Sequence, residues 1–175
     1  MKSQPNNKII LVGFMGTGKS IVSEKLAGQL GWSRVDIDEE IVKAAKKPIS
    51  KIFADDGEDA FRELESRVLE AALASPEQAI VATGGGAVLR ASNRQAMLAH
   101  GFVAALKASP ETIIARVMND SSRPLLQGDV RARVHELLEK RKDAYDFAHL
   151  AIDTTAMTVA EVVQRIADES GLISK

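Results

Sequence analysis

The chain contains the motif Gly13-Phe14-Met15-Gly16-Thr17-Gly18-Lys19-Ser20, in which a glycine and four free positions precede Gly-Lys-Ser. The apolar run 8–12 before it is typical of a buried parallel strand. After it, Val22, Leu26 and Leu30 recur at helical spacing. Strand, glycine loop and helix in this order predict a phosphate-binding loop. Glycines let backbone N–H groups turn towards an anion, and the dipole of the following helix adds positive potential.

Two side chains of this motif have chemistry suited to a nucleotide. Lys19 is expected to reach the outer phosphates, and the hydroxyl of Ser20 can ligate Mg²⁺. The alternative is a glycine-rich turn without a ligand, and the matching strand and helix on either side favour the phosphate site. The nucleotide contacts predicted in this stretch are Gly16, Thr17, Gly18, Lys19, Ser20 and Ile21.

Length and charge restrict the classes of protein. A chain of 175 residues suits one domain with a substantial core. Lys and Arg number 23 against 24 Asp and Glu, and this net charge of -1 gives no general attraction for nucleic acid or an anionic membrane. There is no cysteine, and no apolar run approaches the ~20 residues of a membrane span. We therefore expect a soluble, cytoplasmic protein.

Two aspartates follow the next apolar segment. Residues 32–38 are interpreted as a second strand that ends in Asp36 and Asp38. On a strand this spacing directs both carboxylates to one side, and parallel sheets bind ligands at the carboxyl ends of their strands. One carboxylate could interact with the metal, and the other could interact with a substrate hydroxyl. Alternatively, the two aspartates cap a helix that begins at Glu39.

The following helical segments are broken by Pro48 and again by Gly57. From Glu58 onward an apolar stripe resumes, and Arg62 lies beside it. An arginine in that position is usually part of a surface ion pair, here with Glu58 or Glu65.

Three consecutive glycines follow the third predicted strand, residues 78–83. Glycine costs chain entropy, so Gly84-Gly85-Gly86 suggests that the backbone must approach something closely. A flexible turn is the alternative.

The second half continues the alternation of strands and helices. Ser92 and Gln95 suggest a capping box for a helix that ends at Gly101. Further strands are predicted at 102–106 and 150–153, and helices start at Ser109-Pro110, at Val130 and at Thr158. The helix from Val130 is expected to carry Arg141 and Tyr145 on one flank. The polar segment 119–129 reads as a mobile lid in which Arg123 could swing over the nucleotide and exclude water. Five strands alternating with helices predict an α/β fold with a doubly wound parallel sheet.

The motif Phe53-x-x-x-Gly57-Glu58-x-x-Phe61-Arg62-x-x-Glu65 resembles shikimate kinases. The paired aspartates, the triple glycine, Arg123-Pro124-Leu125-Leu126 and the Arg141-x-x-x-Tyr145 pattern extend this resemblance from about residue 8 to residue 168. It implies a P-loop kinase fold with three layers, the strand order 2-3-1-4-5 and a single domain over 1–175. It also implies a substrate-binding subdomain at about 39–70 and a lid at about 119–129.

The resemblance implies transfer of the γ-phosphoryl group of ATP to the 3-hydroxyl of shikimate, with Mg²⁺, in a monomer. Catalysis is assigned to Lys19, Arg123 and the base Asp38. Arg116 and Arg123 would join the motif residues in binding ATP, and Ser20 and Asp36 would hold the metal. The implied shikimate contacts are Asp38, Arg62, Gly84, Gly85, Gly86 and Arg141.

Two positions depart from the family pattern. Ile21 stands where the family usually has threonine or serine, and Ser23 replaces a usual glycine, so a lower affinity for ATP is expected. A related small-molecule kinase, such as a gluconate kinase, would share the P-loop and a lid. It would have no reason to place Arg62, Arg141 and the triple glycine together. A regulatory nucleotide-binding module would be expected to have lost metal or acceptor residues.

Overall fold

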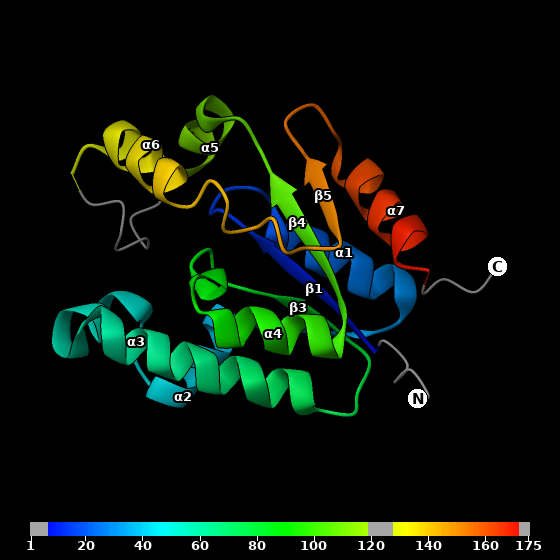
Figure 1. Ribbon diagram of the computed structural model, residues 1–175, viewed down its shortest axis with the longest axis horizontal. Coiled ribbons are helices and arrows are strands. Elements are labelled where there is room, and N and C mark those ends of the chain that lie inside the picture. The colour runs from blue at the N-terminus through cyan, green and yellow to red at the C-terminus, as the bar shows by residue number, and fades with distance from the viewer. Residues whose placement is uncertain (1–6, 119–127, 172–175) are drawn as a thin grey trace.

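A five-stranded parallel sheet in the order β2-β3-β1-β4-β5 forms the centre of the molecule (Figure 1). The computed structural model describes residues 7–118 and 128–171. The strands are β1 Lys8–Gly13, β2 Ser33–Asp36, β3 Ala79–Ala82, β4 Phe102–Lys107 and β5 Leu150–Asp153. The predicted strand order and the α/β class are confirmed.

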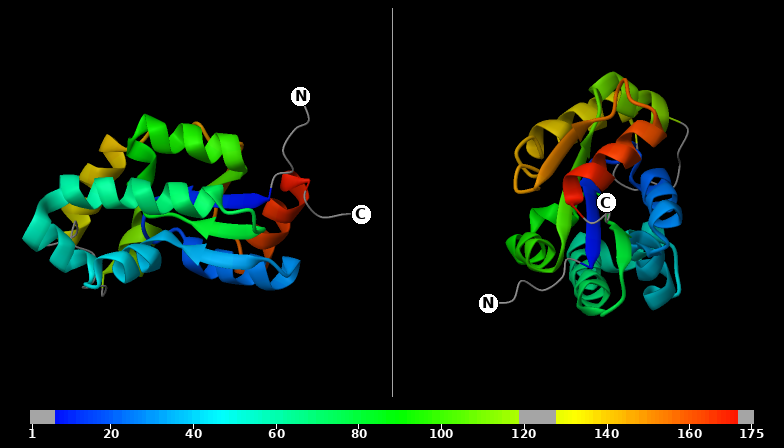
Figure 2. Two further views of the ribbon diagram at one scale, coloured as in Figure 1. Left: turned by 90° about the horizontal axis from the view of Figure 1, so that it is seen from below. Right: turned by 90° about the vertical axis from the view of Figure 1, so that its right-hand side faces the viewer.

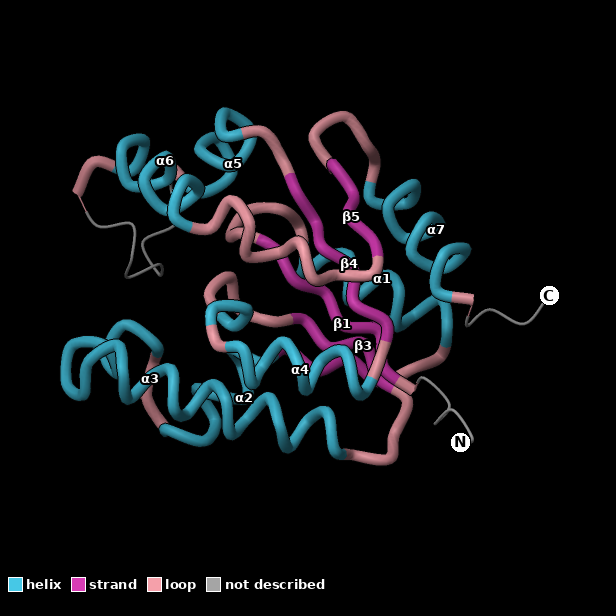
Figure 3. The backbone as a smooth tube through the Cα atoms, in the orientation of Figure 1, coloured by secondary structure: helices cyan, strands magenta, loops and turns pink. Residues whose placement is uncertain are grey.

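Helices cover both faces of this sheet (Figures 2 and 3). One layer contains α1 and α7, which pack together, and the other contains the neighbouring helices α3 and α4. In the described ranges, no helix is both long and apolar enough to cross a bilayer. The helices are α1 Lys19–Leu30, α2 Ile37–Ala45, α3 Ile49–Ala74, α4 Ala91–His100, α5 Pro110–Val117, α6 Val130–Lys140 and α7 Val159–Ser170, with one 3-10 turn, η1, at Ala87–Leu89.

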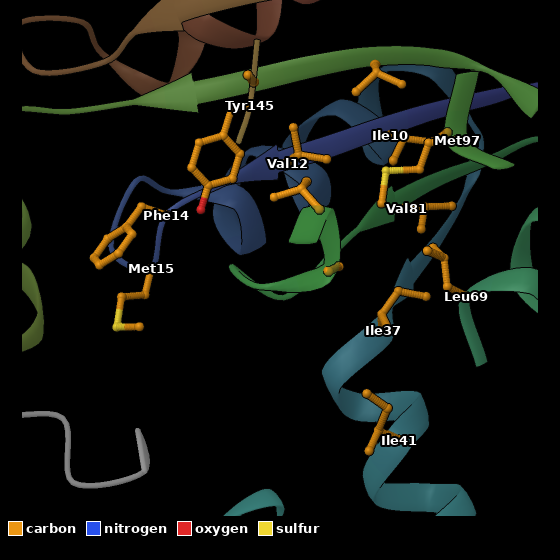
Figure 4. Close-up of a cluster of buried hydrophobic side chains, with 14 of the residues drawn as sticks. Ile10, Val12, Phe14, Met15, Ile37, Ile41, Leu69, Val81, Met97 and Tyr145 are labelled. Atoms are coloured by element: carbon orange, nitrogen blue, oxygen red, sulfur yellow. The ribbon is translucent and has the colours of Figure 1, made fainter. Parts of the chain in front are cut away.

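The alternation of side chains on β1 divides the core into two clusters. Ile10 and Val12 point into the layer of α3 and α4, where they meet Val81 of β3 (Figure 4). Ile9 and Leu11 point to the opposite face, against α1 and α7. Because β1 is buried on both faces, its sequence is a continuous apolar run that leads directly into the glycine loop.

The long helix α3 is divided at Gly57, where φ is 86° and ψ is 171°. This confirms the predicted break, because a residue with a side chain rarely adopts that backbone conformation. The rings of Phe53 and Phe61, on either side of the break, lie 4.8 Å apart.

Two local predictions are wrong. The helix α4 begins at Ala91 with Arg90 at its N-cap and no side-chain cap, because η1 ends just upstream and Asn93 donates to the carbonyl of Ala87 at 2.9 Å. The predicted capping box at Ser92 therefore does not form. In addition, α6 ends at Lys140, and the chain then runs through turns instead of continuing as a helix. A local contact with the 3-10 turn sets the start of α4.

We expect Gly28→Ala to stabilise the protein by about 0.5–1 kcal/mol. Gly28 lies exposed inside α1, and an added Cβ would meet nothing within 4 Å. Alanine loses less chain entropy than glycine when the helix forms. Urea unfolding followed by circular dichroism measures the change. A lower midpoint than that of the wild type would contradict this prediction.

Candidate active site

The loop between β1 and α1 has the form that the motif predicts. Gly18 stands at the N-cap of α1 with φ at 100°, a conformation that opens the first helical turn to an anion. The hydroxyl of Thr17 donates to the carbonyl of Phe14 at 2.8 Å and fixes the loop from within. Lys19 lies across it, with Nζ donating to the carbonyls of Gly13 and Phe14 at 2.6 and 2.9 Å. An ammonium group therefore lies where phosphates would enter.

A first cavity of about 440 Å³ opens over this loop. It brings together all the predicted nucleotide contacts that the structure describes: Gly16, Thr17, Gly18, Lys19, Ser20, Ile21 and Arg116. Arg116 also donates to the carbonyl of Gly16 at 2.8 Å. Arg123, the predicted lid arginine, lies outside the described residues. Sequence reasoning missed Thr154 and Met157, which line the same cavity. Their position just after β5, at the ligand-binding edge of the sheet, is the signal that could have found them.

Ser20 and Asp36 form an oxygen pair at the edge of the first cavity. The Ser20 hydroxyl donates to Oδ2 of Asp36 at 3.4 Å. Among the described residues, no three carboxylate or imidazole side chains gather into a metal cage. The pair nevertheless fits Mg²⁺, which prefers oxygen ligands and takes most of its shell from phosphate and water. Oδ1 of Asp36 also accepts from the backbone N–H of Glu39 at 3.2 Å, so this aspartate caps α2 as well.

Asp38 does not lie on a strand. The strand β2 ends at Asp36, and Asp38 occupies the first turn of α2, where an acid is stabilised by the helix dipole. The prediction that strand spacing directs both carboxylates to one side is therefore wrong. Asp36 lines the first cavity, whereas Asp38 lines both the first cavity and a second one beside it.

The second cavity has a volume of about 350 Å³ and contains all the predicted substrate contacts: Asp38, Arg62, Gly84, Gly85, Gly86 and Arg141. Apolar residues that sequence reasoning did not assign, among them Ile49 and Phe53, complete its wall. The residues common to both cavities are Met15, Asp38, Gly84 and Gly85.

Arg62 is buried, with 8% of its surface exposed, so the expected surface ion pair is wrong. The expected partners are correct, because its guanidinium lies 2.8 Å from Glu65 and 3.5 Å from Glu58. Burial raises the pKa of Glu65, and the neighbouring charge of Arg62 opposes that rise. Phe61 and Glu65, on either side of Arg62 in α3, are buried as well.

Arg141 is also buried, with 4% of its surface exposed. It stands at the C-cap of α6, and its guanidinium lies 5.7 Å from the centre of the Phe14 ring. Burial lowers its pKa and raises the pKa of the nearby Tyr145 to about 12. Its Nη1 is buried and finds no hydrogen-bond partner among the described residues. A buried donor without an acceptor is costly, and an anionic ligand in the cavity would satisfy it.

Arg141 and Tyr145 do not share a helix, because α6 ends at Lys140 and the chain continues in turns. The hydroxyl of Tyr145 donates to the carbonyl of Gly85 at 2.8 Å, and its ring packs in the core beside the glycine loop (Figure 4). This contact outweighs the helical periodicity on which the prediction rested.

The triple glycine makes room for the charged side chains of the second cavity. A Cβ on Gly84 would lie 2.9 Å from Oδ1 of Asp38, and one on Gly86 would overlap the guanidinium of Arg62. At Gly85 a Cβ would lie 3.3 Å from Nη1 of Arg141. The close approach inferred from the sequence is therefore present, and it involves side chains of the protein itself.

The two cavities meet at Asp38, a carboxylate that can accept a proton. A phosphate donor over the glycine loop and a small anionic acceptor beside Arg141 would therefore face each other there. The fold and the site together define a P-loop kinase for a small molecule.

Comparison with known proteins identifies the family. The model of the shikimate kinase family matches residues 15–170, and the chain belongs to that family. A shikimate kinase of Desulforudis audaxviator is 46% identical over 160 residues, which cover 91% of this chain and 84% of that protein.

Solved structures agree with this assignment. The structure of shikimate kinase from Acinetobacter baumannii in complex with shikimate matches with a TM-score of 0.88 and 35% identity. The match covers 92% of this chain and 90% of the other. A gluconokinase from Sinorhizobium meliloti has a TM-score of 0.63 at 20% identity, with 94% and 91% covered, and this likeness shows the fold alone.

Proposed function

We propose that this protein transfers the γ-phosphoryl group of ATP to the 3-hydroxyl of shikimate. The observation that supports it best is the junction of the two cavities at Asp38. A second cavity with two buried arginines suits a small carboxylic acid, and the glycine loop beside it suits the triphosphate. Membership of the shikimate kinase family supports the choice of acid.

In this proposal, catalysis depends mainly on positive charge around the transferring phosphoryl group. Phosphoryl transfer depends more on alignment and charge neutralisation than on covalent catalysis. Lys19 would release the loop carbonyls that it now contacts and bind the outer phosphates. Ser20 and Asp36 would hold Mg²⁺, Asp36 through a water molecule, and the metal would neutralise charge on the phosphate oxygens. Arg123 would add charge from the proposed lid.

The second cavity would orient the acceptor. Arg62 and Arg141 each offer a planar fork suited to a carboxylate, and two forks on one small acid fix its orientation. Asp38 would accept hydrogen bonds from the shikimate hydroxyls and take the proton of the 3-hydroxyl as it attacks.

We also propose that a single domain contains a substrate-binding subdomain and a lid. Residues 39–70 would form the substrate-binding subdomain, because α3 supplies Ile49, Phe53 and Arg62 to the second cavity. Residues 119–129 would form the lid, although 119–127 lie outside the described residues. A monomer suffices, since a single chain lines both cavities.

The test of this function is the identity of the product. Phosphorus NMR of a reaction with Mg-ATP and shikimate should show a new phosphomonoester signal coupled to the proton on carbon 3. Gluconate in place of shikimate should give ADP only at the background rate. A phosphomonoester on gluconate, with none on shikimate, would replace the proposed acceptor.

We expect Gly86→Ala to raise the KM for shikimate by about tenfold to 100-fold, because the added methyl displaces the Arg62 guanidinium. The KM for Mg-ATP should stay within about threefold, since Gly86 does not line the first cavity. Initial rates with each substrate varied in turn measure both constants. Gly28→Ala, where the added methyl has open space, is the matched control. Equal changes in both KM values would contradict the assignment.

A further inference from the structure

Four residues form a closed ring of hydrogen bonds between the start of α1 and the end of β2. The carbonyl of Ser20 accepts from the hydroxyl of Ser23 at 2.7 Å, and that hydroxyl accepts from Nε of Arg34 at 2.9 Å. Nη2 of Arg34 donates to Oδ2 of Asp36 at 3.3 Å. The hydroxyl of Ser20 donates to the same oxygen, so the ring begins and ends at Ser20.

Local geometry supplies the spacing of this ring. Arg34 and Asp36 are two residues apart on β2, so their side chains leave the strand on the same side. Ser23 lies three residues after Ser20 on α1, which places it on the same face of the helix. Ser23 is completely buried, and the side chains of Arg34 and Asp36 are 27% and 13% exposed.

We propose that Ser23 and Arg34 are positioning residues, which hold the oxygens of Ser20 and Asp36 at the spacing that a Mg²⁺-nucleotide complex requires. This inference rests on the proposed function, which assigns Mg²⁺ to those two oxygens. Oδ1 of Asp36 is already fixed by the N–H of Glu39. The contact of Arg34 is what directs Oδ2 towards Ser20. A site that is ordered before binding loses less freedom when the ligand arrives.

The charge of Arg34 acts in the opposite direction, because a cation repels Mg²⁺. Of its two carboxylate partners, Asp36 at 3.3 Å is the group whose charge the metal also needs, so only Glu39 at 3.6 Å offsets the repulsion without weakening the site. We expect positioning to outweigh the repulsion that remains. Ser23 separates the two effects, because its removal opens the ring and leaves the charge in place.

The test is equilibrium binding of ADP, measured by titration calorimetry once with Mg²⁺ and once with EDTA. The Kd measured with EDTA divided by the Kd measured with Mg²⁺ gives the factor by which Mg²⁺ enhances binding. We expect Ser23→Ala and Arg34→Met each to lower this ratio about fivefold, because each opens the ring. The double variant should lower it no further than either single variant. Arg90→Met is the control, since it removes another partly buried arginine that contacts a serine and a glutamate.

Several outcomes would overturn the inference. A loss of ADP affinity that is equal with Mg²⁺ and with EDTA would show a merely structural role. An unchanged ratio, a higher ratio in Arg34→Met, or additive losses in the double variant would each exclude positioning. Asp36→Asn separates this inference from the proposed function. If it leaves the ratio unchanged, the metal assignment itself fails. If it lowers the ratio and the ring variants do not, only the role of Ser23 and Arg34 fails.

Discussion

Asp38→Asn should lower kcat by about 100- to 1000-fold, the loss typical of a missing general base. Asparagine keeps the size of the side chain and one acceptor oxygen beside Gly84, but it takes up no proton. The KM values for Mg-ATP and shikimate should stay within about threefold, because most binding contacts remain. Initial rates with each substrate varied in turn measure all three constants.

Glu40→Gln is the control for this variant. Glu40 lies in the same first turn of α2, and its carboxylate pairs with Lys43 at 3.1 Å on the surface. Glu40→Gln removes the same charge from the same helix end. Because Glu40 lines neither of the two cavities, the kinetic constants of this variant should match those of the wild type. An Asp38→Asn enzyme with unchanged kcat would exclude Asp38 as the base.

Arg141→Met should raise the KM for shikimate by about 100-fold, because loss of a desolvated ion pair costs about 2–5 kcal/mol. The same substitution should not lower the stability of the protein without ligand. The guanidinium is buried and its Nη1 has no hydrogen-bond partner among the described residues, so an apolar side chain of similar volume removes a desolvated charge and an unsatisfied donor. Without ligand, Tm should therefore equal or exceed that of the wild type. The rise in Tm that shikimate produces should be lost.

Arg133→Met provides the comparison for this variant. Arg133 lies on α6 upstream of Arg141, and its guanidinium pairs with Glu136 at 3.0 Å. Its removal should leave the KM for shikimate unchanged. A large fall in the Tm of Arg141→Met without ligand, together with an intact response to shikimate, would make Arg141 a structural residue.

Most of the fold follows from short-range sequence signals. Continuous apolar runs predict β1 and β4, because a strand buried on both faces has no polar alternation. The glycine motif defines the first cavity, because its spacing dictates a local backbone shape. The break at Gly57 and the helix start at Ser109-Pro110 are equally local, and both are confirmed, with Ser109 as the N-cap of α5.

The remaining features depend on tertiary contacts that spacing does not encode. The spacing of Asp36 and Asp38 fits both a strand end and a helix cap, and only the structure shows that Asp36 caps α2 and that Asp38 lies within that helix. The burial of Arg62 and Arg141 depends on what packs over them, and their role in binding is a prediction that comes from the motif resemblance. The ring through Ser23 and Arg34 joins residues from different elements. Ser23 departs from the family pattern, but the sequence does not show that Arg34 is its partner.

Whether the second cavity binds shikimate as the phosphoryl acceptor can be decided from the rate of ADP release from Mg-ATP in a coupled assay. The assay is run without an acceptor and with shikimate, gluconate or nucleoside monophosphates as acceptors. The same protein, shown to be folded and to bind ATP, is used in each case. Shikimate alone should stimulate ADP release strongly. No stimulation by shikimate, or an equal rate with gluconate, would contradict the claim that the second cavity is a shikimate site.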